Sequence, residues 1–219
     1  ADLGLGNLRL LLPMISGPDE LEQALALLEQ ALGQLLGEGY PVTRPPLGVM
    51  IEVPAAAYQA ETLARRADFL SVGTNDLAQY LLATDRNNPR VSGRLAPVHP
   101  ALLQALRQVV DGAHRVGKTV TVCGEMASDP AAGLLLLGMG FDGLSMSHAA
   151  LPRVKSAVRA TSSVRMRALA EEALRCERVE GIRTALNAVL HEVGLDAGDL
   201  APGFLMPPSH QARPADMAR

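Results

Sequence analysis

Short apolar runs of strand type alternate five times with amphipathic helical patterns along this chain of 219 residues. The runs begin near Leu8, Leu47, Phe69, Thr119 and Asp142, and a leucine- or alanine-rich helical pattern follows each of them. Such alternation is typical of parallel strands joined by right-handed helical crossovers, which leaves a barrel or an open doubly wound sheet. We therefore expect an α/β fold.

The ends of the apolar runs favour the barrel over the doubly wound sheet. No glycine-rich dinucleotide fingerprint follows any run, and polar residues stand at the C-terminal ends of several, where barrel enzymes place their sites. We expect a parallel (β/α)8 TIM-barrel type, here a fragment with about five units, and two further C-terminal helices from about residue 162. Residues 198–219 hold several prolines and no apolar periodicity, which predicts a domain over 1–197 followed by a disordered tail.

The composition limits the choice of partners. Hydrophobic residues make up 48% of the chain, enough for a sizeable core, and the formal net charge is −3. Without a basic surplus, nucleic acid and anionic membranes are not expected as main partners. No signal peptide and no apolar run of about 18 residues occur, so we expect no membrane insertion and a cytoplasmic location. Because a core strand is predicted so close to Ala1, we expect the chain to be part of a longer protein.

Two carboxylates follow apolar runs at positions where a buried strand has no use for charge. Glu52 follows the run at 47–51, and Asp76 comes shortly after the run at 69–73. Burying a carboxylate is costly unless it is paired or bound to a metal. If the two strands are neighbours in a parallel sheet, the carboxylates converge on one point, and their oxygens suit Mg²⁺. Taken singly, each could equally be a salt-bridged or capping carboxylate.

A cation and a thiol are expected beside this metal site. Arg86 follows a short helical pattern after Asp76, and its planar fork of donors suits phosphate or carboxylate. Cys123 ends the strand predicted at 119–122, where its thiol could exchange a proton with a substrate. A buried structural cysteine is the alternative for Cys123. Together these residues predict a phosphorylated or carboxylated substrate.

Five motifs occur in a fixed order along the chain: Gly48–Pro54, Gly73–Leu77, Asp85–Asn88, Cys123–Met126 and Gly138–Asp142. Together they resemble the phosphoenolpyruvate-binding domain of Enzyme I, the phosphoenolpyruvate-protein phosphotransferase of the bacterial phosphotransferase system. The resemblance covers roughly residues 8–159. It implies a transferase that takes a phosphoryl group from phosphoenolpyruvate, passes it to a histidine on an N-terminal domain, and releases pyruvate. The phosphoenolpyruvate-binding domain of the family is a barrel of eight strand-helix units, so the five units here would be its last five.

The resemblance implies a role for each candidate residue. Glu52 and Asp76 would hold Mg²⁺, which neutralises charge on the substrate. Asn75, Asp76 and Arg86 would bind the substrate, and Cys123 would donate the proton to carbon. Two further substrate-binding arginines of the family lie on earlier barrel strands, which this sequence does not contain. Weak or absent substrate binding is therefore expected of this chain alone.

The resemblance also implies partners outside this sequence. A histidine-containing phosphocarrier protein would be reached through the missing N-terminal domain, and the barrel would form a homodimer. The stretches at 44–46 and 151–155 resemble the nitrogen-regulation branch of the family more than the sugar-transport branch. Which branch applies, and which ligands regulate it, stays open.

Two alternatives remain open. Pyruvate phosphate dikinase and phosphoenolpyruvate synthase share the barrel and the Gly-Thr-Asn-Asp motif, but there we expect Phe-Ser-Arg in place of Thr84-Asp85-Arg86 and a histidine in place of Met126. The other alternative is a non-catalytic dimerisation module in which the metal site is vestigial.

Overall fold

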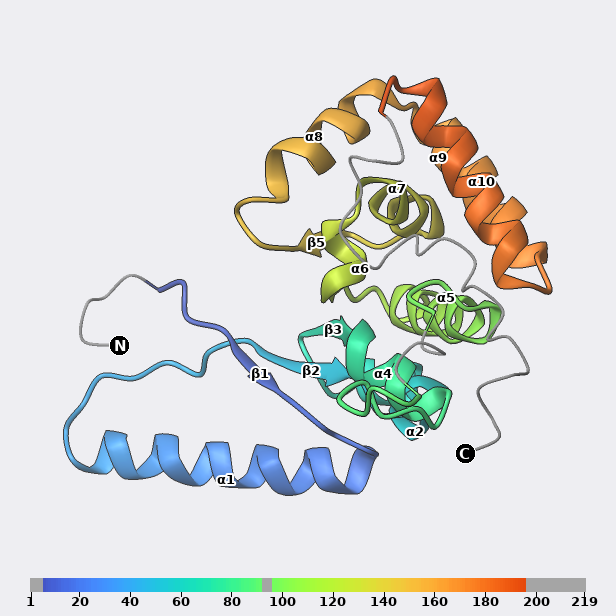
Figure 1. The fold of residues 1–219 in the computed structure, drawn as a ribbon. Helices are drawn as coiled ribbons and strands as arrows, with labels where there is room; N and C mark the ends of the chain where they lie inside the picture. Colours follow the sequence, from blue (N-terminus) through green and yellow to red (C-terminus); the bar gives the residue numbers. More distant parts are fainter. Residues whose placement is uncertain (1–5, 92–95, 196–219) are drawn as a thin grey trace.

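The computed structural model describes residues 6–91 and 96–195, which form one parallel sheet with helices packed around it (Figure 1). The strands are β1 (Leu10–Leu12), β2 (Leu47–Ile51), β3 (Phe69–Gly73), β4 (Val120–Cys123) and β5 (Gly143–Ser145). The helices are α1 (Pro18–Gly37), α2 (Pro54–Tyr58), α3 (Ala60–Ala64), α4 (Thr74–Leu81), α5 (Pro100–Arg115), α6 (Glu125–Ser128), α7 (Pro130–Met139), α8 (Leu151–Ala160), α9 (Ser163–Arg175) and α10 (Val179–Glu192).

The strand order decides between the two architectures left open by the sequence. The strands lie in the order β1-β2-β3-β4-β5, and every neighbouring pair is parallel. A doubly wound sheet reverses its order at a switch point, whereas a barrel wall keeps its strands in chain order. The described residues therefore form a five-stranded wall of barrel type, and the prediction of an α/β fold with five barrel units is confirmed.

The two faces of the sheet differ in chemistry because side chains alternate along each strand. One face is apolar and almost completely buried, and helices α2, α3 and α5 lie against these strands. Its members are Leu47, Val49, Ile51, Leu70, Val72, Val120 and Val122. The other face, called the inner face below, carries small and polar residues. Its members are Gly48, Met50, Ser71, Gly73, Thr121, Cys123, Gly143 and Ser145, together with Phe69.

Two aspartates fix the strand register at the N-terminal end of the sheet. Asp68 precedes β3 and accepts the backbone N–H of Leu47, the first residue of β2, at 2.8 Å. Asp142 precedes β5 and accepts the backbone N–H of Val120, the first residue of β4, at 2.8 Å. The hydrogen bond from the Leu47 N–H is the main cause of the lowered pKa of Asp68. The same aspartate contact thus recurs at two places in the wall, at the end opposite the candidate site.

Helices α9 and α10 form a second layer outside the helices that cover the sheet (Figure 1). Helix α9 packs on α7, whose residues are almost all buried. The two backbones approach closely at Gly138, where an added Cβ atom would lie 2.0 Å from the carbonyl oxygen of Met166. The two predicted C-terminal helices therefore pack on the outside of the barrel wall.

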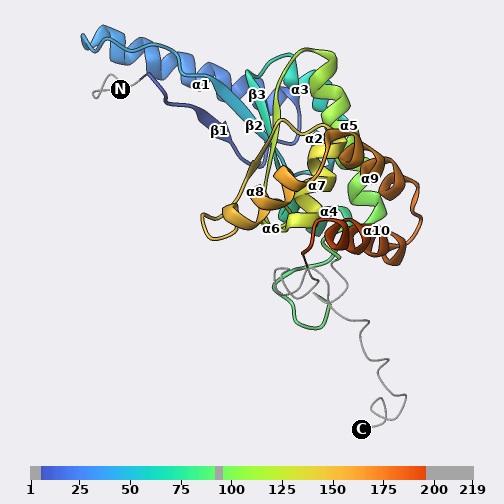
Figure 2. The ribbon, with the colours of Figure 1, turned by 90° about the horizontal axis from the view of Figure 1, so that it is seen from above.

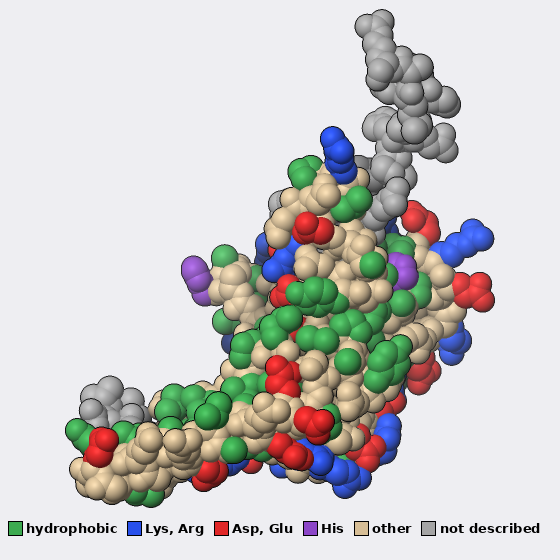
Figure 3. All heavy atoms as spheres, turned by 90° about the horizontal axis from the view of Figure 1, so that it is seen from below, with side chains coloured by type: hydrophobic (Ala, Val, Ile, Leu, Met, Phe, Trp, Pro, Cys, Tyr) green, Lys and Arg blue, Asp and Glu red, His purple; other side chains and the backbone are tan. Residues whose placement is uncertain are grey.

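Helix α1 and strand β1 project from the rest of the molecule (Figure 2). Of the residues of α1, Leu21 is buried, while Leu27 and Leu36 are 68% and 57% exposed. The arm that holds α1 carries hydrophobic side chains on the face seen in Figure 3. Helix α1 thus makes few contacts with the rest of the described chain.

Some local predictions need correction. The helical pattern after the run at 47–51 predicts a single helix over residues 55–66, but the structure has two short helices there, α2 and α3, because the backbone leaves the helical region at Gln59. The pattern after Cys123 predicts one helix over residues 129–137, and the structure adds the short helix α6 before it. The tail predicted at 198–219 lies outside the described residues. In the described ranges, no helix combines the length and apolar character needed to cross a bilayer.

The buried carboxyl of Asp129 should make stability depend on pH. Its Oδ1 accepts the backbone N–H of Ala132 at 2.9 Å and starts α7, but its Oδ2 has no hydrogen-bond partner among the described residues. Burial raises the pKa of Asp129 to about 6, against hydrogen bonds from Ala131 and Ala132 and the charge of Arg153. The protonated carboxyl therefore favours folding, and this contribution is present below about pH 4 and lost as pH rises through about 6.

We expect Asp129→Asn to remove this dependence. On lowering the pH from about 7 to about 4, wild-type stability should rise relative to the variant by up to about 3 kcal/mol. Urea unfolding at several pH values measures the difference. The slope of stability with pH is the readout, because an asparagine amide group at the position of Oδ2 would also lack a partner. Parallel pH profiles for the two proteins would contradict the prediction.

Candidate active site

Two of the polar residues predicted from the sequence, Glu52 and Cys123, lie at the C-terminal end of the inner face. Ile51 pairs with Val72, and Gly73 pairs with Cys123, which pairs in turn with Ser145. Glu52, one residue past Ile51, therefore lies next to Gly73. A row of four residues results: Glu52, Gly73, Cys123 and Ser145. The ends of β2 to β5 bring together residues that are far apart in sequence.

The Glu52 carboxylate is buried, with 4% of the residue exposed. Its Oε1 accepts the backbone N–H of Met14 at 2.8 Å. Met14 adopts a left-handed conformation with φ of 57°, which is uncommon for a residue with a side chain. An added Cβ atom at Gly73 would lie 2.7 Å from Glu52 Oε2, so the glycine leaves the space that this oxygen needs. One oxygen of Glu52 is thus held by the chain after β1, and the other lies at the end of β3.

The Cys123 thiol lies on the inner face, at the end of β4. Its S–H donates to the carbonyl oxygen of Val72 at 3.3 Å, and the Ser71 hydroxyl donates weakly to Sγ at 3.9 Å. The side chain is partly exposed. The thiol is therefore held beside β3, next to the position of Gly73, and is not enclosed in the apolar core.

The first turn of α4 contributes Asn75 and Asp76. The Thr74 hydroxyl donates to the carbonyl oxygen of Cys123 at 3.1 Å, which ties this turn to β4. Asn75 Oδ1 accepts the backbone N–H of Glu125 at 3.4 Å. With Oδ1 oriented in this way, the Asn75 amide N–H₂ is the group left to donate to a ligand.

Arg86 reaches back to the first turn of α4. Its Nη2 lies 3.2 Å from Asp76 Oδ1. Arg86 also lines a cavity of about 70 Å³. The other lining residues are Thr74, Asn75, Ala78, Pro97, Glu125 and Met126. The structure therefore brings Asn75 and Arg86 together around one small cavity, and Asp76 is joined to this group through its ion pair with Arg86.

The donors at this site suit Mg²⁺ only if other ligands complete its coordination. Glu52 and Asp76 offer hard oxygen atoms, and Gly73 leaves open space against Glu52 Oε2. Across residues 6–91 and 96–195, no cluster of three or more His, Cys, Asp or Glu side chains could hold a metal ion. Mg²⁺ often uses one or two carboxylates and takes its remaining ligands from water and substrate phosphate. The residues present fit an ion held in that way.

Some contacts at the site were not predicted from the sequence. The backbone N–H of Met14 carries no side-chain signal, and only the fold places it beside Glu52. Ser71 and Ser145 could have been found from strand alternation, because each shares the inner face with Cys123. The ion pair between Asp76 and Arg86 depends on the path of the loop between them.

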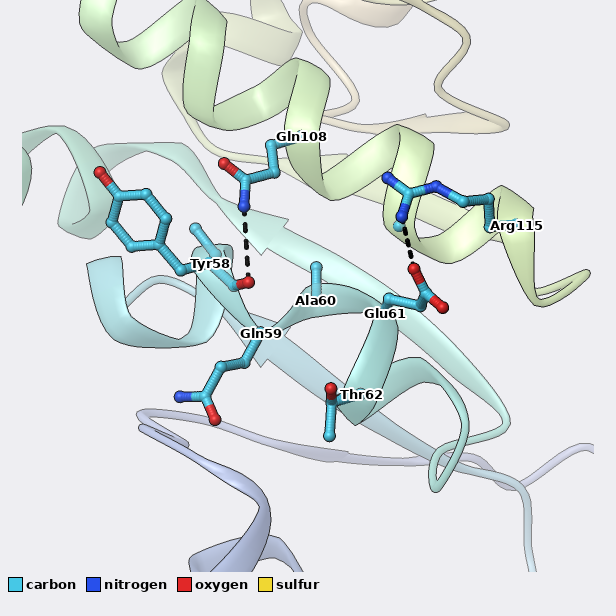
Figure 4. Close-up of a pocket in the computed structure, with 9 residues that line it drawn as sticks. Tyr58, Gln59, Ala60, Glu61, Thr62, Gln108 and Arg115 are labelled. Carbon is cyan, nitrogen blue, oxygen red and sulfur yellow. Dashed lines mark hydrogen bonds and ion pairs between the residues drawn. The ribbon is translucent and has the colours of Figure 1, made fainter.

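A larger cavity lies elsewhere, between α2, α3 and α5 (Figure 4). Its volume is about 300 Å³, and its lining includes Tyr58, Glu61, Gln108 and Arg115. The polar groups there bind one another: Gln108 donates to the carbonyl oxygen of Tyr58, and Arg115 pairs with Glu61. Because helices α2, α3 and α5 lie on the apolar face of the sheet, this cavity is separate from the inner-face row.

Comparison with known proteins identifies the class of domain. Residues 1–163 match the family described as PEP-utilising enzyme, PEP-binding domain. The chain belongs to this family of phosphoenolpyruvate-binding domains.

Its curated relatives are much longer. The "Phosphoenolpyruvate-dependent phosphotransferase system" protein of Salmonella typhimurium is 39% identical over 197 residues, which cover 89% of this chain and 26% of that protein. The phosphoenolpyruvate-protein phosphotransferase of Enterococcus faecalis is 42% identical over 179 residues, covering 81% of this chain and 31% of that protein. The chain thus spans less than a third of the length of these relatives.

A solved structure supports the fold. A citrate lyase from Burkholderia xenovorans LB400 aligns with a TM-score of 0.52 and 18% sequence identity, covering 84% of this chain and 62% of that chain. At this identity the likeness concerns the fold alone.

Replacing Gly124 should lower stability for two separate reasons. Its backbone has φ of 114° and ψ of −178°, a region open to little except glycine. An added Cβ atom would also lie 2.5 Å from Thr74 Oγ1. We expect Gly124→Ala to lower the free energy of unfolding by about 2–4 kcal/mol and to displace the first turn of α4.

Gly117→Ala is the matched control. Gly117 also has a positive φ, of 69°, but an added Cβ atom would meet nothing within 4 Å. Its replacement should cost only about 1–2 kcal/mol. Urea unfolding of both variants measures the difference, and equal losses would show that the contact with Thr74 contributes nothing.

Proposed function

We propose that this chain is the part of a phosphoenolpyruvate-protein phosphotransferase that binds phosphoenolpyruvate and Mg²⁺. The main support is the meeting of Glu52, Asp76, Arg86 and Cys123 at one end of a barrel-type wall in a member of a phosphoenolpyruvate-binding family. The names of its curated relatives agree with this function. The reaction takes the phosphoryl group from phosphoenolpyruvate to a histidine on a domain outside this sequence, and then protonates the remaining enolate to pyruvate.

Each residue has a role that suits its chemistry. Glu52 and Asp76 would hold Mg²⁺, which when bound neutralises negative charge on the substrate oxygens. The Asn75 amide N–H₂ donates to the phosphate, and the Arg86 guanidinium binds it through its fork of donors. These contacts hold the phosphoryl group in line with the incoming histidine.

Cys123 serves the second half of the reaction. When the phosphorus–oxygen bond breaks, the electron pair stays on the substrate, which becomes the enolate of pyruvate. The Cys123 S–H then gives its proton to the methylene carbon, and pyruvate and a thiolate result. The Ser71 hydroxyl, 3.9 Å from Sγ, is placed to donate to that thiolate. Solvent reprotonates the sulfur before the next turnover.

The partners follow from the same proposal. A histidine-containing phosphocarrier protein receives the phosphoryl group from the histidine domain, and the intact protein is a homodimer in the cytoplasm. A relative from Xanthomonas campestris, 42% identical over 177 residues, is named "Multiphosphoryl transfer protein", which supports a place in such a chain of transfers. The phosphocarrier that the protein recognises decides between sugar transport and nitrogen regulation.

Replacing Cys123 should separate the two halves of the reaction. In the intact gene product, Cys123→Ser or Cys123→Ala should slow pyruvate formation at least about 100-fold and slow formation of the phosphohistidine much less, because phosphoryl transfer precedes protonation. Rapid-quench measurement of both products in one experiment gives the ratio.

Cys176→Ala is the control for this experiment. Cys176 lies at the end of α9, in the outer helical layer. A cysteine with a structural role should cost about 1 kcal/mol of stability on replacement and leave the ratio of the two rates unchanged. Equal losses in both rates for the Cys123 variants would remove Cys123 from the mechanism.

The 219-residue chain by itself should not complete the reaction. Incubated with phosphoenolpyruvate, Mg²⁺ and a histidine phosphocarrier, it should transfer no phosphoryl group, because no histidine among its residues lies in the family's phosphohistidine motif. A coupled pyruvate assay with the pure chain tests this. Pyruvate release above the no-enzyme rate, at any phosphocarrier concentration, would contradict the prediction.

A further inference from the structure

The Arg86 guanidinium lies between a carboxylate and a cavity. Its Nη2 is 3.2 Å from Asp76 Oδ1, and the same side chain lines the cavity beside Asn75. The Arg86 and Asp76 side chains are 40% and 31% exposed, so neither is locked in the core. Arg86 can therefore contact either Asp76 or an anion in the cavity with a modest change of conformation.

The backbone of Arg86 is fixed while its side chain is long and accessible. Its N–H donates to Gln79 Oε1 at 3.1 Å, and Gln79 lies on the same helix as Asp76. Asp85, the residue before Arg86, closes the turn around it: Asp85 Oδ1 accepts the backbone N–H of Asn87 at 2.8 Å. A side chain that exchanges partners from a fixed backbone needs no rearrangement of the loop.

Asp76 has two competing uses. An ion held by Asp76 would lie close to the guanidinium that now pairs with Oδ1, and two positive charges at that separation repel each other. An anionic group in the cavity attracts Arg86 and leaves Asp76 to the ion. The two cations therefore compete for one carboxylate until an anion is present.

We propose that Arg86 is a substrate-operated gate on the metal site: it pairs with Asp76 when the cavity is empty and releases Asp76 when the substrate phosphate enters. This inference rests on the proposed function and extends it to the order of binding. The ion and the substrate then bind with positive coupling, and by thermodynamic necessity each raises the affinity for the other by the same factor.

Mn²⁺ is a suitable probe, because it prefers oxygen ligands in octahedral geometry and its free concentration is measured by electron paramagnetic resonance. The titrations use the intact gene product, with and without 2-phosphoglycolate, which carries a phosphate and a carboxylate but has no enol ester to react. Without 2-phosphoglycolate, Arg86→Gln should bind Mn²⁺ about two- to fivefold tighter than wild type, the range for an exposed ion pair. With it, the wild-type affinity should rise, and the affinity of Arg86→Gln should rise much less.

Arg90→Gln is the matched control. Arg90 lies in the same loop, and its replacement removes the same charge, but the hydrogen bond from Arg90 to Asn88 Oδ1 comes from its backbone N–H. A smaller effect in Arg90→Gln than in Arg86→Gln supports the gate. Equal effects in the two variants, or full coupling retained in Arg86→Gln, would overturn it.

Asp76→Asn distinguishes failure of the gate from failure of the proposed function. If Asp76 is a metal ligand, this variant should bind Mn²⁺ more weakly than wild type when 2-phosphoglycolate is present. Wild-type binding by Asp76→Asn would remove the metal site, and the gate with it. If Asp76→Asn weakens Mn²⁺ binding but Arg86→Gln leaves it unchanged, the gate is overturned while the proposed metal site stands.

Discussion

The Glu52 carboxylate can lie at the end of β2 only because residue 73, beside it on β3, has no side chain. A Cβ atom there would approach Glu52 Oε2 to 2.7 Å. A buried carboxylate is tolerated only with partners, and one oxygen already has the Met14 N–H at 2.8 Å. The second oxygen lies against the space over Gly73, at the end of β3. The position of this one carboxylate thus depends on two backbone features, a glycine and a left-handed methionine.

The two ends of the sheet have separate tasks. At the N-terminal end, Asp68 and Asp142 accept backbone N–H groups of neighbouring strands and hold the register. That register determines which residues face inward at the other end, because a slip of one residue would move Glu52 and Cys123 to the helix-covered face. Stability at one end therefore maintains the geometry of the site at the other, as is typical of barrel enzymes.

The sequence predicted the strands and the residues at their ends better than it predicted the contacts among those residues. Apolar runs that end in Glu52, in Gly73 and in Cys123 carry a strong local signal, and parallel pairing then brings them together. The break at Gln59 between α2 and α3 carries no proline or glycine, so helical periodicity concealed it. The partner of Asp76 depends on a loop whose path is set by Gln79, and no pattern of spacing encodes that hydrogen bond.

The charges around Arg86 suggest why, under the proposed function, a cation and an anionic substrate would need each other. Arg86 and Glu125 line the small cavity, and Asp76 pairs with Arg86 beside it. Of these three side chains two are carboxylates, and both would repel a substrate that carries a phosphate and a carboxylate. Under the proposed function, a divalent ion held by Asp76 would offset that repulsion, and in the structure Asp76 pairs with Arg86. In that proposal the arginine that pairs with Asp76 is also the group that binds the anionic substrate, so one ion pair links the charge balance around Asp76 to the selectivity for an anion.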